Sequence, residues 1–194
     1  MKNTKQTKLN IYQIALIGLM AALVFVSSHM SIPIPLGFDN TRLHLGNVFC
    51  VLSGIVLGPF GGGLSAGIGS FFFDLTNPLY VSSAPFTLVF KFMLAFVCGQ
   101  VAYMNNKNGL NVRYNFMAAV AGSFTYIVLH LSKGAIEQIF FLNMEVAAVM
   151  LTTSQKAAVS SMNAVLAVIF SGIIAIPLQK ALSASGLRAK LQSK

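Results

Sequence analysis

The chain has 194 residues, of which 56% are hydrophobic and only 9% are charged, and its formal net charge is +9 at pH 7. An average soluble domain has about 25% charged residues, so this composition excludes an ordinary soluble protein and predicts an integral membrane protein. The positive charge requires no nucleic-acid partner, because the anionic headgroups of a lipid bilayer attract basic residues.

Long apolar segments between polar breaks predict the membrane spans. A spanning helix needs about 20 residues, with a range of about 17 to 25. The candidate spans cover approximately residues 11–30, 43–60, 61–75, 86–104, 114–131 and 157–178. Residues 134–153 are mixed in character and are left open between helix and loop. We therefore expect an all-α integral membrane protein, a six-transmembrane-helix bundle that forms one domain over residues 11–180.

The second and third spans are short and are joined at the sequence GPFGGG. They either cross the membrane as a pair or form a re-entrant hairpin, and both arrangements return the chain to the side it came from. We favour crossing, because the two spans together are long enough.

The distribution of basic residues predicts the orientation, because cytoplasmic loops are enriched in Lys and Arg. With the N-terminus inside, the cytoplasmic segments hold Lys2, Lys5, Lys8, Lys107, Arg113, Lys180, Arg188, Lys190 and Lys194. The basic tails at residues 1–10 and 181–194 are therefore both expected to be cytoplasmic, on a multi-pass protein.

The glycine cluster has the spacing of a phosphate-binding loop, but Leu64 stands where that loop needs its lysine, so ATP hydrolysis is not expected. Glycines four residues apart offer a smooth helix face, for internal packing or for docking of another membrane subunit. Cys50 and Cys98 lie in apolar segments and are expected to be buried free thiols. The scattered histidines predict no metal site, and no catalytic constellation or cofactor motif is evident.

Polar residues in or next to the apolar segments gather toward the predicted outer face and define a candidate pocket for one polar solute. The candidate substrate-binding residues are Arg42, His44, Asn47, Asp74, Lys91, His130, Lys133 and Asn163. Tyr126, Tyr80 and Phe38 could supply flat faces for a ring.

Simpler roles remain open for these polar residues. Lys91 could instead extend to the membrane interface, and Lys133 could form a plain surface pair with Glu137. Asn163 needs a partner, either another helix or a bound solute. Acidic and basic residues on the outer side roughly balance, so their charge selects neither an anionic nor a cationic solute. These residues are Arg42, Lys91, Lys133 and Lys156 against Asp39, Asp74, Glu137 and Glu145.

Four sequence blocks carry a family resemblance: H-L-G-N at 44–47, L-G-P-x-x-G-G at 57–63, G-S-x-x-x-D-L at 69–75 and A-P-F-T-L-x-x-K at 84–91. With these blocks the chain resembles the substrate-binding S components of energy-coupling-factor (ECF) transporters, closest to the riboflavin-type branch. The resemblance implies a binding subunit in a bacterial cell membrane. Its partners would be a vitamin-type solute, a transmembrane coupling subunit and two cytoplasmic ATPase subunits.

In that family small residues of the first helix contact the coupling subunit, which here implies a docking face at Ala15, Gly18 and Ala22. The absence of tryptophan argues against a thiamine-type cargo; riboflavin-like, pyridoxine, pyrimidine and pantothenate types stay open. The alternatives are a self-sufficient secondary transporter or channel, a membrane enzyme, or a structural scaffold that uses the glycine faces.

Overall fold

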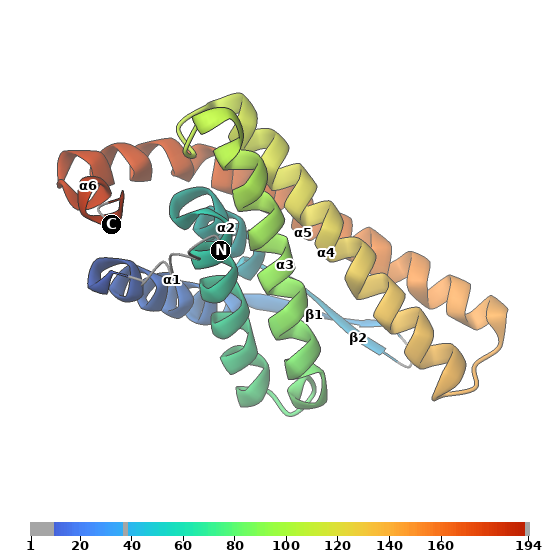
Figure 1. Cartoon of the computed structure of the whole chain (residues 1–194). Coiled ribbons are helices and arrows are strands. Elements are labelled where there is room, and N and C mark those ends of the chain that lie inside the picture. Colours follow the sequence, from blue (N-terminus) through green and yellow to red (C-terminus); the bar gives the residue numbers. More distant parts are fainter. Residues whose placement is uncertain (1–9, 37–38, 193–194) are drawn as a thin grey trace, which may run out of the picture.

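The computed structural model describes residues 10–36 and 39–192. Five of its helices are long and apolar enough to cross a membrane, which agrees with the expected helical membrane class (Figure 1). They are α1 (Ile11–His29), α2 (Gly46–Thr76), α3 (Ala84–Tyr103), α4 (Val112–Phe140) and α5 (Val146–Ala184). The short elements are β1 (Ser31–Leu36), β2 (Asp39–His44), η1 (Val81–Ser83), η2 (Met104–Asn106) and α6 (Leu187–Gln192).

Helix α2 is folded into a hairpin at Gly58, where φ is 76° and ψ is −174°. This left-handed φ favours glycine, and the following Pro59 suits the first position of a new helical leg. Cys50 Sγ lies 3.8 Å from Ser70 Oγ across the hairpin, whereas a straight helix would separate them by about 30 Å. The predicted turn within GPFGGG is thus confirmed, and the two expected short spans correspond to the two legs of α2.

Glycines let the legs of α2 and the neighbouring α3 approach closely. A Cβ atom on Gly62 would lie 2.5 Å from the Cα atom of Gly54, and one on Gly99 would lie 2.5 Å from the backbone nitrogen of Pro59. Contacts this short exist only because the side chains are absent. Of the two roles open for the glycine cluster, these positions take internal packing.

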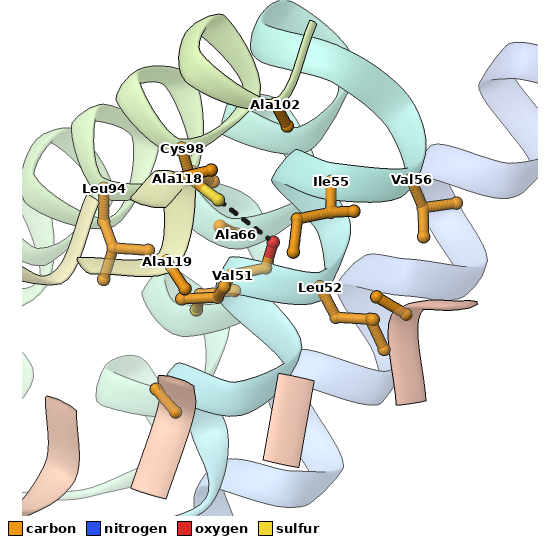
Figure 2. Packing of buried hydrophobic residues seen from close by; sticks show 14 of the residues in the cluster. Val51, Leu52, Ile55, Val56, Ala66, Leu94, Cys98, Ala102, Ala118 and Ala119 are labelled. Atoms are coloured by element: carbon orange, nitrogen blue, oxygen red, sulfur yellow. Dashed lines mark hydrogen bonds between the residues drawn. The ribbon is translucent and has the colours of Figure 1, made fainter. Parts of the chain in front are cut away.

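The hydrophobic core is formed around α2. In its most apolar window 67% of the residues are buried, against 28–33% in the other long helices, whose outer faces are free to contact lipid. Figure 2 shows Val51, Ile55, Leu94 and Cys98 meeting where α2 packs on α3, with the Cys98 thiol 3.5 Å from the Val51 carbonyl oxygen. Both cysteines are free and buried, as expected.

The segment left open by the sequence is mostly helical. Helix α4 continues to Phe140, and α5 begins at Val146 after a short connection, so the two helices extend well beyond the expected 114–131 and 157–178. They lie side by side along their length (Figure 1), and Thr152 Oγ1 donates a 2.6 Å hydrogen bond to Gln138 Oε1 close to that connection. Hydropathy alone underestimates both helices because their added turns carry polar residues.

Two short strands lie between α1 and α2 in this otherwise helical membrane protein. Strands β1 and β2 pair as an antiparallel hairpin, with Ser31 opposite His44 and Leu36 opposite Asp39. Pro33 and Pro35 lie at alternate positions of β1, so both missing N–H groups belong to the same edge of the strand. Within the described residues β1 pairs with β2 alone, and a strand with one partner tolerates prolines because its other edge forms no ladder.

The described part of the C-terminal tail is also ordered. Helix α6 packs near the start of α1, where Asn10 Nδ2 donates to Lys190 O at 3.0 Å and Gln13 Nε2 donates to Leu191 O at 2.8 Å. The remaining tail residues, 1–9 and 193–194, lie outside the described residues, and so do their lysines and Phe38.

Candidate functional site

A cavity of about 150 Å³ lies among β2, η1, α2, α3, α4 and α5. Six of the eight predicted binding residues line it: Arg42, His44, Asp74, Lys91, His130 and Lys133. The other two, Asn47 and Asn163, each bond to a lining residue. The structure therefore brings together side chains from four long helices and one strand. The sequence predicted only that these side chains lie toward the same, outer face of the membrane.

Arg42 is held rigidly in the cavity wall. Its Nη2 atom lies 3.1 Å from Asp74 Oδ1, and its guanidinium lies over the rings of Phe73 and Tyr80 at 4.1 and 4.3 Å from their centroids. Its Nη1 atom is buried and has no hydrogen-bond partner among the described residues. The side chain is thus held by two rings and a carboxylate and retains an unused donor.

Lys91 is 2% exposed and does not extend to the membrane interface. Its Nζ atom donates a hydrogen bond to Asn47 Oδ1 and lies 3.8 Å from the centroid of the Tyr126 ring. The Tyr126 ring stacks on His130, with an interplanar angle of 13° and a centroid separation of 5.5 Å. Helix α3, which begins with the A-P-F-T-L-x-x-K block, therefore places the Lys91 ammonium in the cavity wall, where neutral groups hold it.

Asn163 supports the site through the backbone of β2. Its Oδ1 atom accepts from the N–H of His44 at 2.9 Å, and its Nδ2 atom donates to the carbonyl oxygen of Arg42 at 2.8 Å. Its partner is therefore a strand, an option the sequence did not suggest. This pair of bonds fixes the strand that carries Arg42 and His44 against α5.

His44 is buried at the end of β2, and its Nδ1 atom accepts a 3.1 Å hydrogen bond from the N–H of Gly46. Burial lowers the pKa of His44 well below 6.5, and the nearby charges of Lys91, Arg42 and His130 lower it further. The imidazole is therefore neutral at pH 7, in agreement with its role as an acceptor.

The Lys133 ammonium lies at the rim, 2.6 Å from Glu137 Oε2 and 3.1 Å from Ser83 Oγ. Glu137 is about half exposed, at 46%. The Lys133–Glu137 pair that the sequence left open is present, and both residues line the cavity together with His130.

Sequence reasoning did not assign Lys156 and Ser160 to the site, although both line the cavity. They precede Asn163 by seven and three residues, so they share its face of α5, and this spacing could have revealed them. Glu145 is exposed at the start of α5, and the side chain of Asp39 lies outside what is described. Of the charged residues that the sequence places on the outer side, four basic and two acidic ones line the cavity among the described side chains.

The expected docking residues lie together on α1. Ala15, Gly18 and Ala22 are all exposed, and a Cβ atom on Gly18 would meet nothing within 4 Å. Gly18 and Ala22 line an apolar groove of about 490 Å³ together with Ile68 and Phe72 of α2. Among the described residues, no group of three His, Cys, Asp or Glu side chains could hold a metal ion.

Comparison with known families gives a match over residues 8–184 to the family described as "ECF-type riboflavin transporter, S component". Among curated proteins, no match was found.

Proposed function

The chain belongs to the family of ECF-type riboflavin transporter S components, and from this premise we propose that it captures a water-soluble vitamin or vitamin precursor for an ATP-driven importer. S components are substrate-binding transporter subunits and not enzymes. The solute would bind in the cavity formed by β2, η1, α2, α3, α4 and α5. The observation that carries this proposal is the convergence of six predicted polar residues on that one cavity.

The orientation follows from charge. The end opposite the cavity holds the turn of α2, the connection after α3 and helix α6, since Gln179 Nε2 bonds to Ile55 O and Arg188 Nη2 bonds to Asn108 O there. Its described basic residues are Lys107, Arg113, Lys180, Arg188 and Lys190. We take this end as cytoplasmic, with both termini inside, in a bacterial cell membrane. The cavity then faces outward, and both legs of α2 cross, which gives the six-helix bundle.

Transport requires partners in this proposal. A transmembrane coupling subunit would dock on the α1 face around Gly18, and two cytoplasmic ATPase subunits would supply the energy. The loaded subunit would then reorient in the membrane and release its solute inside. A smooth, exposed face with open space at Gly18 supports docking, because small residues let another helix backbone come close.

Identification of the bound solute tests the proposed function. The full chain is purified in detergent from cells grown in rich medium, denatured, and its released small molecules are identified by mass spectrometry. We expect one vitamin-type solute in near-stoichiometric amount. An empty protein that also gains no thermal stability from a panel of vitamins would contradict the proposal.

A bulky residue on the docking face should separate binding from transport. In the Gly18→Phe variant we expect solute binding to be unchanged and ATP-dependent uptake with the coupling module to be lost, because the phenyl ring blocks close helix contact. Gly172→Phe is the matched control, since Gly172 also has open space around it but lies on α5. Undiminished uptake by the Gly18→Phe variant would refute the docking face.

Uptake without the coupling module decides the alternative, a self-sufficient secondary transporter or channel. Reconstituted alone in vesicles, the protein should show no net uptake of its solute. Uptake driven by an ion or solute gradient would favour the alternative.

A further inference from the structure

Among the described side chains of the cavity wall, basic groups outnumber acidic ones. Arg42, Lys91, Lys133 and Lys156 line it, against Asp74 and Glu137. Asp74 bonds to Arg42 and Glu137 bonds to Lys133, so neither carboxylate is an ion-pair partner of Lys91. This set of described side chains favours an anion over a cation.

Lys91 is the most buried of these cations, and its contacts are with neutral groups. Asn47 Oδ1 accepts one of its hydrogen bonds and the Tyr126 ring faces the ammonium, but no carboxylate among the described residues lies within ion-pair distance. A buried cation is costly unless an anion compensates it. No described carboxylate compensates the charge of Lys91, so an anionic group on a bound solute can take that role.

Arg42 offers a second, fixed contact. Two aromatic rings and Asp74 hold its guanidinium in one orientation, which leaves the buried Nη1 donor without a partner among the described residues. A buried donor that lacks an acceptor is costly, and an oxyanion is the acceptor that binds a guanidinium most strongly. Arg42 and Lys91 both line the cavity, so both can contact one bound group.

The cavity volume indicates how much of a solute can be buried. The volume is about 150 Å³, and a protein cavity of about that size accommodates one benzene molecule. A solute with one ring, or an aliphatic chain of similar size, fits this volume, and because the cavity is partly open, a larger solute would leave its remaining part outside. The rings of Tyr80 and Tyr126 in the wall can pack against such a solute.

We propose that the solute is a compact organic anion whose acidic group binds to Lys91 and Arg42. This inference rests on the proposed function and narrows it: the cargo is an acid whose buried part is of about one-ring size. The carboxylate or phosphate of the solute takes the place of the missing counter-charge in the cavity.

Pairs of solutes that differ in an acidic group test whether the cavity prefers a negatively charged solute. Binding to the full chain in detergent is measured by calorimetry and thermal shift for nicotinate and nicotinamide, pantothenate and panthenol, and pyridoxal phosphate and pyridoxal, with riboflavin as a larger neutral solute. We expect an acid from these pairs to bind, and its neutral partner to bind at least about 30-fold more weakly, the low end for loss of one side of a buried charge pair. The first two pairs report a carboxylate and the third reports a phosphate.

The Lys91→Met variant tests whether Lys91 binds the acidic group of the solute. It should weaken binding of the preferred acid at least about 30-fold and leave the weak binding of the neutral partner unchanged. Lys107→Met is the control, because Lys107 is exposed at the opposite end and should not alter binding. The wild-type comparison of acid with neutral partner remains decisive if the Lys91→Met variant does not fold.

The outcomes separate this inference from the proposed function. A recovered cargo that is neutral or cationic, or a neutral partner that binds as tightly as its acid, overturns the inference and leaves the binding subunit intact. A protein without cargo that binds none of the solutes overturns both. An acidic cargo recovered from rich medium supports the inference even if it is none of the acids in the panel.

Discussion

The two ends of the α2 hairpin are both buried but are built in opposite ways. At the open end Asn47 and Asp74 are each bonded to a basic residue from elsewhere in the chain, Lys91 and Arg42. At the turn end Gly54 and Gly62 touch through their backbones, and charged groups take no part in that contact. The same helix therefore uses side-chain chemistry at one end and the lack of side chains at the other.

This difference predicts which kind of substitution disrupts each end of the hairpin. The open end depends on charge and hydrogen bonding, so it should be sensitive to isosteric substitutions that remove a charge. The turn end depends on distance, so it should be sensitive to one added methyl group. Solute binding should depend on the open end alone, and three substitutions test this contrast.

The largest effect is expected at the open end. Asp74→Asn keeps the shape of the side chain but leaves Arg42 without its counter-charge, and breaking a buried pair in this way costs about 3 kcal/mol or more. Thermal and denaturant unfolding in detergent measure this loss. The double variant Arg42→Met/Asp74→Asn should recover part of the stability but no solute binding. A single Asp74→Asn variant as stable as the wild type would show that the pair is unimportant for the fold.

The next effect is expected at the turn end. In the Gly99→Ala variant the added methyl group meets the backbone of Gly58 and Pro59, which cannot rotate away, so unfolding free energy should fall by about 2 kcal/mol. Gly172→Ala is the matched control in another helix, where nothing lies within 4 Å and alanine should be neutral or stabilising by up to about 1 kcal/mol. Equal stability of the two variants would contradict the close contact at the turn.

A smaller effect concerns acid sensitivity. Above pH 6.5 His44 is neutral in both the folded and the unfolded chain, so it contributes no pH dependence. Burial lowers the pKa of His44 in the folded chain. As the pH falls below 6.5, His44 therefore becomes protonated in the unfolded chain while it stays neutral in the folded chain. Stability should therefore fall by up to about 1.4 kcal/mol per pH unit, until the folded pKa is reached. His44→Gln should flatten this decline in melting temperature.

Two controls accompany the acid experiment. His29→Gln removes an exposed imidazole from α1 and should leave the decline as steep as in the wild type. Gly99→Ala should lower stability by the same amount at every pH, since its effect is steric. A parallel decline in His44→Gln and in the wild type would show that another group governs the acid response.

Much of the helical layout could be predicted because lipid exposure gives a strong local signal. The apolar runs place α1, α3 and both legs of α2 within a few residues, and Gly58-Pro59 places the turn between the legs. The ends of α4 and α5 could not be predicted in the same way, because the turns beyond the apolar runs carry polar residues such as Gln138 and Thr152, which satisfy each other. A hydropathy profile does not detect such pairs.

The candidate site could be predicted as a set of residues but not as an arrangement. Intramembrane polar residues such as Lys91 and Asp74 are costly, and that cost marks them in the sequence. Their partners come from distant segments, and the bonds from Asn163 to the backbone of β2 depend on a strand that was not predicted from the sequence. The sequence likewise does not show which of the outer acids reach the cavity, and exposed Glu145 does not line it.

The buried cysteines provide a practical reporter. Cys50 and Cys98 are the two cysteines of the chain, and both have an exposed fraction of 0%. Thiol reagents need an accessible sulfur, so a fluorescent maleimide should not modify the native fold. A cysteine introduced at the exposed hairpin position Ile32 could then be labelled selectively without removing either native thiol. Slow modification of Cys98 would in turn time the local opening of α2 from α3, so one labelling experiment can follow both the β-hairpin and the integrity of the core.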